Sequence, residues 1–258
     1  MLFVTIILSG SLLTSSGPGL RPLQDPVAAA IEKFHSPDLS IRVAAFYSID
    51  EIPHVFERPD VIAATVNLLL TEDTTQRAIA TSGPGSPTWN AVRRLGDEGW
   101  ANYSGDLTTV VSNYVSQTHD PAAIHALILS GAPPGSGAVQ EYAHFGAIAL
   151  PDLYAGATSP DPNLRASSVA VLGEMLIEDE KAPGSLVPPD QRARAKQAVI
   201  AGLKDPEESG AAPEAMRALA ALHEPGDREL VEQAATDNPR PGHRELGRAL
   251  LSRWGSGH

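Results

Sequence analysis

The chain has 258 residues, a net charge of −12 and no cysteine, so disulfides, thiolate metal sites and cysteine nucleophiles are excluded together. Hydrophobic residues make up 42% of the sequence and aromatic residues only 5%, a balance that suits closely packed helices better than sheet. No basic stripe is present to neutralise phosphates, which argues against nucleic acid as a partner. Because 22 prolines and 22 glycines would interrupt long helices, we expect an all-α fold of many short elements.

Residues 1–16, "MLFVTIILSGSLLTSS", are predicted to be a signal peptide, with an apolar core and small residues at Thr14 and Ser16 before the expected cleavage site. No Lys or Arg precedes the apolar run, so the alternatives are an uncleaved anchor, a mis-assigned start and a plain N-terminal segment. The run is shorter than the roughly 20 apolar residues that span a bilayer, and we expect no stable membrane span in the mature chain. The many arginines and only four lysines are typical of a GC-rich bacterial genome. An exported protein, periplasmic or extracellular, is therefore expected.

Three stretches of the remaining chain share a proline and, five residues later, an arginine: Pro37 and Arg42, Pro160 and Arg165, and Pro239 and Arg244. The residue before each proline can accept a hydrogen bond from a free amide in the first turn of a helix: Ser36, Ser159 and Asn238. We therefore predict that a helix begins at each proline, with the preceding residue as N-cap and the proline at the first helical position.

Eight residues after each of these prolines the side chain is small: Ala45, Ser168 and Gly247. A small residue on the packed face of a helix lets a neighbouring helix approach closely. We expect the helices to pack in tight pairs.

Further copies of the motif are weaker. One keeps Pro206 but has lost the arginine, and two others centre on Glu72 and Asp120. The anchors at residues 37, 72, 121, 160, 206 and 239 are on average about 40 residues apart, and amphipathic runs precede several of them. A period of about 40 residues made of paired helices is typical of HEAT and armadillo arrays.

The stretches "SPDLSIRVAAFYSI", "ALPDLYAGATSPDPNLRASSVAVLGEM" and "AKQAVIAGLKDPEESGAAPEAMRALAAL" resemble HEAT-repeat proteins of the armadillo type. In that family the second helix of each unit opens with an Asp-Pro-like turn and an apolar-Arg pair, as at Ile41-Arg42. The resemblance implies that residues 17–258 form one α-solenoid domain of about five to six helix pairs. It also implies that Arg42, Arg165 and Arg244 form a structural ladder with acidic or turn groups of adjacent units. The family has no common catalytic residues to transfer.

Residues 81–106 fit the repeat least, and we expect an irregular unit near residues 81–118. Trp89 and Trp100 lie among dense Gly, Pro, Ser and Asn. The stretch is interpreted as a distorted unit whose tryptophans fill the core, because long structureless loops are uncommon inside compact arrays. An exposed loop that contacts a partner through Trp89 and Trp100 is the alternative.

No phosphate-binding loop and no nucleophile elbow is present in the sequence. HEAT-type hydroxylases bind iron through repeated His-Glu pairs, and only His223-Glu224 matches that dipeptide. We therefore assign no catalytic residue, no metal ligand and no cofactor. The expected function is that of a non-catalytic scaffold or adaptor, which binds a basic or neutral protein partner on its curved surface. The alternatives are an enzyme or enzyme subunit on the same scaffold, of the lyase or metal-dependent hydroxylase type, and a subunit of an envelope assembly.

Overall fold

A computed structural model describes residues 25–82, 85–131 and 135–254, and in these ranges all regular structure is helical. Thirteen α-helices and two short 3₁₀ segments are present, and the part of the chain that is described contains no strand. The expected all-α class is therefore confirmed. The predicted signal peptide, residues 1–16, lies outside the described residues.

The first half of the described chain contains α1 (Pro26–Phe34), α2 (Leu39–Asp50), the 3₁₀ segment η1 (Val55–Glu57), α3 (Pro59–Ser82), α4 (Pro87–Leu95), α5 (Asp97–Thr118) and α6 (Pro121–Ser130). The second half contains α7 (Gly137–Ala143), η2 (Gly146–Ile148), α8 (Leu150–Ala157), α9 (Pro162–Lys181), α10 (Pro189–Gly202), α11 (Ala212–Leu222), α12 (Asp227–Asp237) and α13 (Pro241–Arg253).

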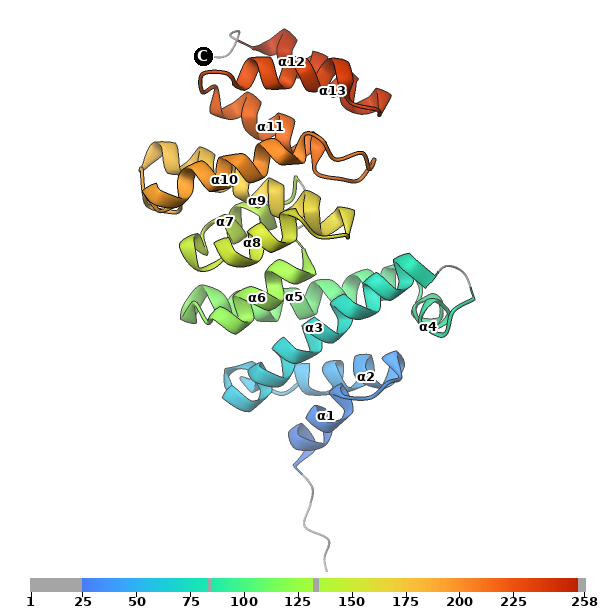
Figure 1. The fold of residues 1–258 in the computed structure, drawn as a ribbon. Coiled ribbons are helices and arrows are strands. Elements are labelled where there is room, and N and C mark those ends of the chain that lie inside the picture. The colour runs from blue at the N-terminus through green and yellow to red at the C-terminus, as the bar shows by residue number, and fades with distance from the viewer. Residues whose placement is uncertain (1–24, 83–84, 132–134, 255–258) are drawn as a thin grey trace, which may run out of the picture.

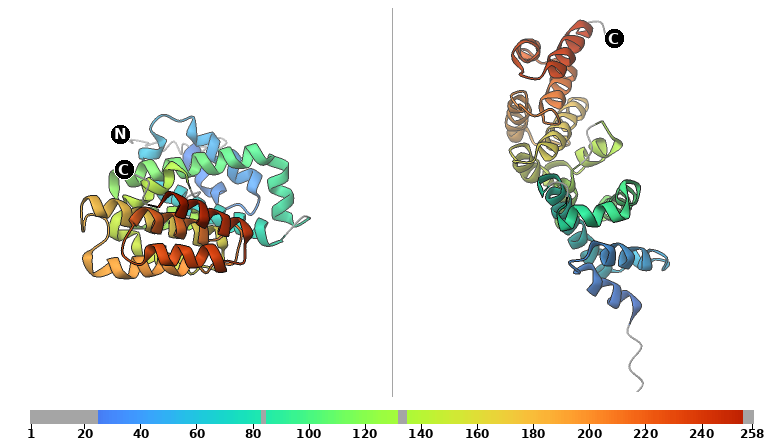
Figure 2. Two further views of the ribbon diagram at one scale, coloured as in Figure 1. Left: turned by 90° about the horizontal axis from the view of Figure 1, so that it is seen from above. Right: turned by 90° about the vertical axis from the view of Figure 1, so that its right-hand side faces the viewer.

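The helices follow one another along a single column, with α1 at one end and α12 and α13 at the other (Figure 1). The perpendicular views show that the column is elongated and that its axis bends (Figure 2). Many helices pack against the next one along the chain, as α1 does with α2, α5 with α6, α8 with α9 and α12 with α13, while α3 packs mainly against α5 and α6, and α10 mainly against α9. The short helix α7 packs against α9. One hydrophobic core cluster extends from Val27 in α1 to Ala234 in α12.

Two helix starts differ from the prediction. The N-caps of α2 and α9 are Asp38 and Asp161, whose carboxylates accept hydrogen bonds from the amides of Ser40 and Asn163, both at 2.9 Å. The predicted caps, Ser36 and Ser159, instead accept from the amides of Asp38 and Asp161 in the preceding turn. The placement of Pro37 and Pro160 at the first helical position was therefore wrong by two residues. Two cap-forming side chains stand in tandem at each site, and the helix begins after the second.

The third copy and the degenerate copy show related shifts. Asn238 accepts from the amide of Arg240 at 2.9 Å, and α13 begins at Pro241 rather than at Pro239. Pro206 lies in the loop between α10 and α11, six residues before α11 begins at Ala212. The weak copy at Glu72 does not start a helix, because Glu72 lies inside α3, where no proline or glycine interrupts the helix.

Close approach of helices takes place at small residues, as the spacing predicted. A Cβ atom added to Gly156 in α8 would lie 2.0 Å from Oγ of Ser168 in α9. A Cβ atom added to Gly247 in α13 would lie 2.7 Å from Cβ of Ala235 in α12. Gly173 in α9 has no room for a methyl group either, because Cβ of Ala218 in α11 would be 2.6 Å away. Backbones approach this closely only where one partner lacks a side chain.

The region expected to be irregular, residues 81–118, is largely helical. α4 and the 22-residue α5 cover most of it, and α5 is a regular helix. The short α4 lies to the side of the column beside the end of α3 (Figure 1). None of the helices in the described ranges combines the length and the apolar composition that crossing a bilayer requires.

Candidate functional site

Arg42 in α2 joins two neighbouring helices through buried polar groups. Its Nε and Nη2 donate to the two carboxylate oxygens of Glu72 in α3, at 2.7 and 2.9 Å, and its Nη1 donates to the carbonyl of Ser36 at 2.8 Å. The hydroxyl of Tyr103 in α5 donates to Glu72 at 2.9 Å, and burial raises the pKa of this tyrosine. Three helices are thus connected by one buried ion pair with matched hydrogen bonds.

Arg165 in α9 repeats the arrangement with Asp205, in the loop after α10. Its Nε and Nη2 donate to Asp205 at 2.6 and 2.9 Å, and its Nη1 donates to the carbonyls of Ser159 and Pro160. Burial alone would raise the pKa of Asp205. Hydrogen bonds from Arg165 and from the amides of Ala211 and Glu207 outweigh it and lower the pKa to about 2. The carboxylate is therefore charged at neutral pH and fixes both the helix pair and the loop.

Arg244 in α13 repeats the bonds that Arg165 makes to backbone carbonyls. Its Nη1 donates to the carbonyls of Asn238 and Pro239, at 2.7 and 3.2 Å, in the same geometry as Arg165. Neither Nε nor Nη2 of Arg244 meets an acceptor within residues 25–254 as described. None of the predicted arginines is brought together with Trp89 or Trp100 into one site.

Trp100 and Trp89 have different surroundings. Trp100 in α5 packs against the core, with its ring 6.0 Å from that of Tyr103. Trp89 in α4 is half-buried, and the guanidinium of Arg93 lies 5.1 Å from its ring centroid. Trp100 is half-buried and packs against the edge of the core, and whether it fills the core stays a prediction. Partner contact through Trp89 stays a prediction.

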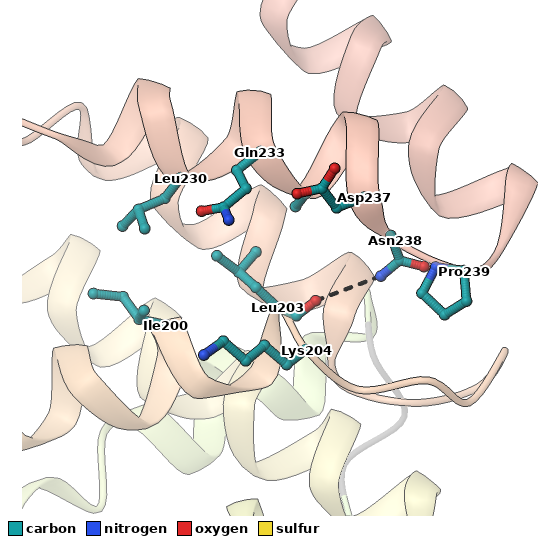
Figure 3. Close-up of a pocket in the computed structure, with 9 residues that line it drawn as sticks. Ile200, Leu203, Lys204, Leu230, Gln233, Asp237, Asn238 and Pro239 are labelled. Atoms are coloured by element: carbon teal, nitrogen blue, oxygen red, sulfur yellow. Dashed lines mark hydrogen bonds between the residues drawn. The ribbon is translucent and has the colours of Figure 1, made fainter.

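A groove lies between α10 and α12 (Figure 3). Its cavity volume is about 270 Å³. Leu230 and Ala234 on α12 face Ile200 and Leu203 on α10 across the gap. Ile200 and Leu230 are half-buried, so apolar surface is accessible on both walls.

Polar groups lie at the rim of this groove. Lys204, in the turn after α10, and Gln233 and Asp237 on α12 are exposed and lie beside the apolar walls (Figure 3). Asn238 closes one end, where its side-chain amide donates to the carbonyl of Leu203 at 3.4 Å. An apolar floor between polar rim groups is the usual construction of a site that buries apolar side chains of a partner.

In this part of the molecule, α9, α11 and α13 form one layer of helices and α10 and α12 form the other. The groove exists because the helices are packed more closely in the first layer than in the second. On one side α9 packs directly on α11, and α11 on α13, with Gly173 at the first of these contacts. On the other side α10 and α12 are each held mainly by α11 and by α9 or α13. The separation of α10 from α12 therefore follows from the close approach of the opposite layer.

An ion-pair network joins the two walls of the groove at their N-terminal ends. Arg192 in α10 pairs with Glu224 at 2.7 Å, and Lys196 also pairs with Glu224 and, at 2.7 Å, with the buried Asp227 of α12. Hydrogen bonds from Lys196 lower the pKa of Glu224. The network fixes α12 relative to α10, so the groove is formed before any partner binds.

The residues that line the groove were not singled out from the sequence, although a signal was present. Ile200 and Leu203 belong to the run "RAKQAVIAGL", and Leu230 and Gln233 to "ELVEQAA". Both runs are amphipathic with helical spacing, which identifies a packed face but not which part of that face is left uncovered.

His223 and Glu224, the only His-Glu pair, do not converge on a common site. His223 ends α11 in a left-handed conformation with its ring 4.7 Å from that of Trp254, and Glu224 faces Lys196. Among the residues that are described, no group of three or more His, Asp or Glu side chains is arranged to hold a metal ion.

Comparison with known proteins gives no assignment: no family model matches the sequence, and no curated protein is significantly similar to it.

Proposed function

We propose that the chain is a non-catalytic scaffold of the HEAT-repeat type that binds a protein partner in the groove between α10 and α12. Three features support the solenoid interpretation: the packing of many helices against the next one along the chain, the hydrophobic core cluster, and arginines that connect one helix to the next stacked segment. In such arrays each unit contacts only its neighbours, and extended surfaces remain free for binding. Export by way of residues 1–16 stays a prediction from the sequence.

The observation that carries the proposal is the accessible apolar surface on both walls of the groove. Half-buried Ile200 and Leu230 face each other across a preformed gap, and burial of such side chains drives association. The flanking Lys204 and Asp237 favour a partner segment with both apolar and polar side chains, such as an amphipathic helix. The net charge of −12 favours a basic or neutral partner and accelerates its association.

The test is photo-crosslinking in the native host from a residue at the rim. A photoreactive amino acid at Gln233 is expected to give a discrete adduct with a partner, and the same group at the exposed Gln197 on α10, which does not line the groove, is the matched control. Leu230→Asp should abolish the adduct. Ile148→Asp, at an apolar side chain that is 45% exposed elsewhere, should leave it intact.

The proposal is wrong if Gln197 gives the same adducts as Gln233, or if the adduct at Gln233 survives Leu230→Asp in a protein that remains folded. Circular dichroism of each purified variant shows whether the helices are retained.

A further inference from the structure

Comparison of the three equivalent arginines identifies an incomplete ion pair at the α13 end of the column. In Arg42 and Arg165, Nη1 binds backbone carbonyls at the corner before the helix, while Nε and Nη2 bind a carboxylate. That carboxylate comes each time from the segment stacked next along the column: Glu72 in α3, and Asp205 after α10. Arg244 binds its two carbonyls and has no carboxylate in the described ranges.

The guanidinium of Arg244 is therefore already oriented for a carboxylate. The bonds from Nη1 to Asn238 and Pro239 fix the plane of the guanidinium, as they do in Arg165. A guanidinium group that is already held in place loses little further conformational entropy when it binds a carboxylate through two parallel hydrogen bonds. The half-buried position of Arg244 limits screening by solvent.

The surroundings of Arg244 match an acidic helix rather than a free anion. Arg248 lies one turn further along α13, is exposed, and has no ion-pair partner within the described part of the chain. Leu251, one more turn along the same stripe, is half-buried and offers apolar surface. Within α13, Glu245 is the one acidic residue, so this face is basic in a protein whose net charge is −12.

We infer that the face of α13 formed by Arg244, Arg248 and Leu251 binds an acidic, amphipathic helix of another protein, with one carboxylate paired to Nε and Nη2 of Arg244. A second carboxylate one turn along that helix would reach Arg248. This surface is separate from the groove between α10 and α12. An experiment can therefore disprove one of the two proposed binding sites without affecting the other.

The test uses the full chain and two 20-residue alanine-based helical peptides. One peptide carries two glutamates four residues apart beside a leucine, and the control peptide carries glutamines instead. Fluorescence anisotropy at low salt should show saturable binding of the glutamate peptide only. A protein with a charge of −12 repels an acidic peptide in general, so saturable binding requires a local basic face.

Four variants locate the site. Arg244→Gln is expected to weaken binding at least tenfold and Arg248→Gln several-fold, because each removes a charged hydrogen-bond donor. Arg228→Gln on α12, where Arg228 pairs with Glu232 in its own helix, changes the net charge equally and should leave affinity within twofold. Arg244→Lys keeps the charge and should not restore binding, because an ammonium group lacks the planar fork.

The inference is overturned by any of four results. These are equal binding of the two peptides, no saturable binding up to millimolar peptide, an effect of Arg228→Gln equal to that of Arg244→Gln, or full binding by Arg244→Lys. Because Arg244→Gln also removes bonds at the α12–α13 corner, its thermal melt is compared with that of Arg248→Gln, which touches no such bond.

Discussion

At the scale of single residues, the same arginine position has three different surroundings. Arg42 and Glu72 are almost fully buried, with 5% and 3% of their side chains exposed, and Arg165 is 18% exposed beside an Asp205 that is 4% exposed. Among the residues that the structure describes, Arg244 has only backbone partners. A buried carboxylate that loses its cation is strongly destabilised, whereas loss of an arginine without a carboxylate partner leaves no buried charge behind.

Replacement of these arginines should therefore separate the two situations. Arg165→Ala is expected to lower the free energy of unfolding by about 3 kcal/mol or more, since it leaves Asp205 buried and unpaired. Arg244→Ala should cost about 1 kcal/mol, for its bonds to two carbonyls. Urea denaturation of both variants measures the difference, and equal losses would contradict the assignment.

The acid sensitivity of the protein should depend on Asp205. Its pKa of about 2 in the folded state lies below the ordinary value of 3.8, so the unfolded chain binds a proton at this residue first. The stabilisation is complete above the ordinary value and is lost as the pH falls from there towards 2. Arg165→Ala should reduce this contribution, because only the bonds from the amides of Ala211 and Glu207 remain. Urea titrations between pH ~5 and ~2.5 should therefore show a smaller acid-induced loss of stability in the variant than in the wild type.

Some of these residue roles could be predicted and others could not. The arginine motif identified Arg42, Arg165 and Arg244 as equivalent, because it is local in sequence. Their partners could not be predicted, since Glu72 and Asp205 are 30 and 40 residues away and depend on which segment stacks next. The motif also could not distinguish the tandem cap residues, such as Ser159 and Asp161, because both side chains form the same type of hydrogen bond.

At the scale of helices, the tightness of packing depends on a few positions without side chains. Gly173 allows α9 and α11 to approach until a methyl group would not fit, and Gly156 does the same for α8 and α9. Glycine in a helix interior ordinarily costs about 1 kcal/mol relative to alanine. The close contacts that it permits offset this cost.

Two Gly→Ala substitutions should have effects of opposite sign. Gly173→Ala places a Cβ atom 2.6 Å from Cβ of Ala218, and we expect a loss of about 1–3 kcal/mol from overpacking. Gly105→Ala in α5, where nothing lies within 4 Å, should instead gain about 1 kcal/mol from helix propensity. Thermal unfolding followed by circular dichroism compares them, and a gain in both would show that α9 and α11 are not in close contact.

The start of α9 offers a test of the observed cap. Asp161→Ala should cost about 1 kcal/mol, because the amide of Asn163 loses its acceptor at the helix terminus. Ser159→Ala removes a bond in the turn outside the helix and should cost clearly less. The two values from chemical denaturation would be reversed if the helix began at Pro160.

At the scale of the whole molecule, an elongated column should be measurable in solution. A compact globule of this length has a radius of gyration of about 18 Å. The stacked arrangement in Figure 1 predicts a clearly larger value for a chain that begins at Asp25. Small-angle X-ray scattering gives this value directly, and a result near 18 Å would contradict the arrangement.

The sequence was sufficient to predict the helical class, because its small apolar residues and many prolines are local properties. It was not sufficient to predict the groove between α10 and α12, because the uncovered part of an amphipathic face depends on how far apart the neighbours lie. The unusual α4 was expected as an irregularity near Trp89, but its position beside α3 depends on the length of α3.

The chain of neighbour-to-neighbour contacts also has a mechanical consequence. Helices α1 to α6 meet the later helices mainly where α6 packs against α8 and α9, so this junction is crossed by every load path between the two ends. Tension between α1 and α13 passes through each interface in series, and the interface with the least helix–helix contact should extend first. The interface between α6 and α8 should therefore deform first. A force applied at either end would change the curvature of the column there before it changes the packing elsewhere.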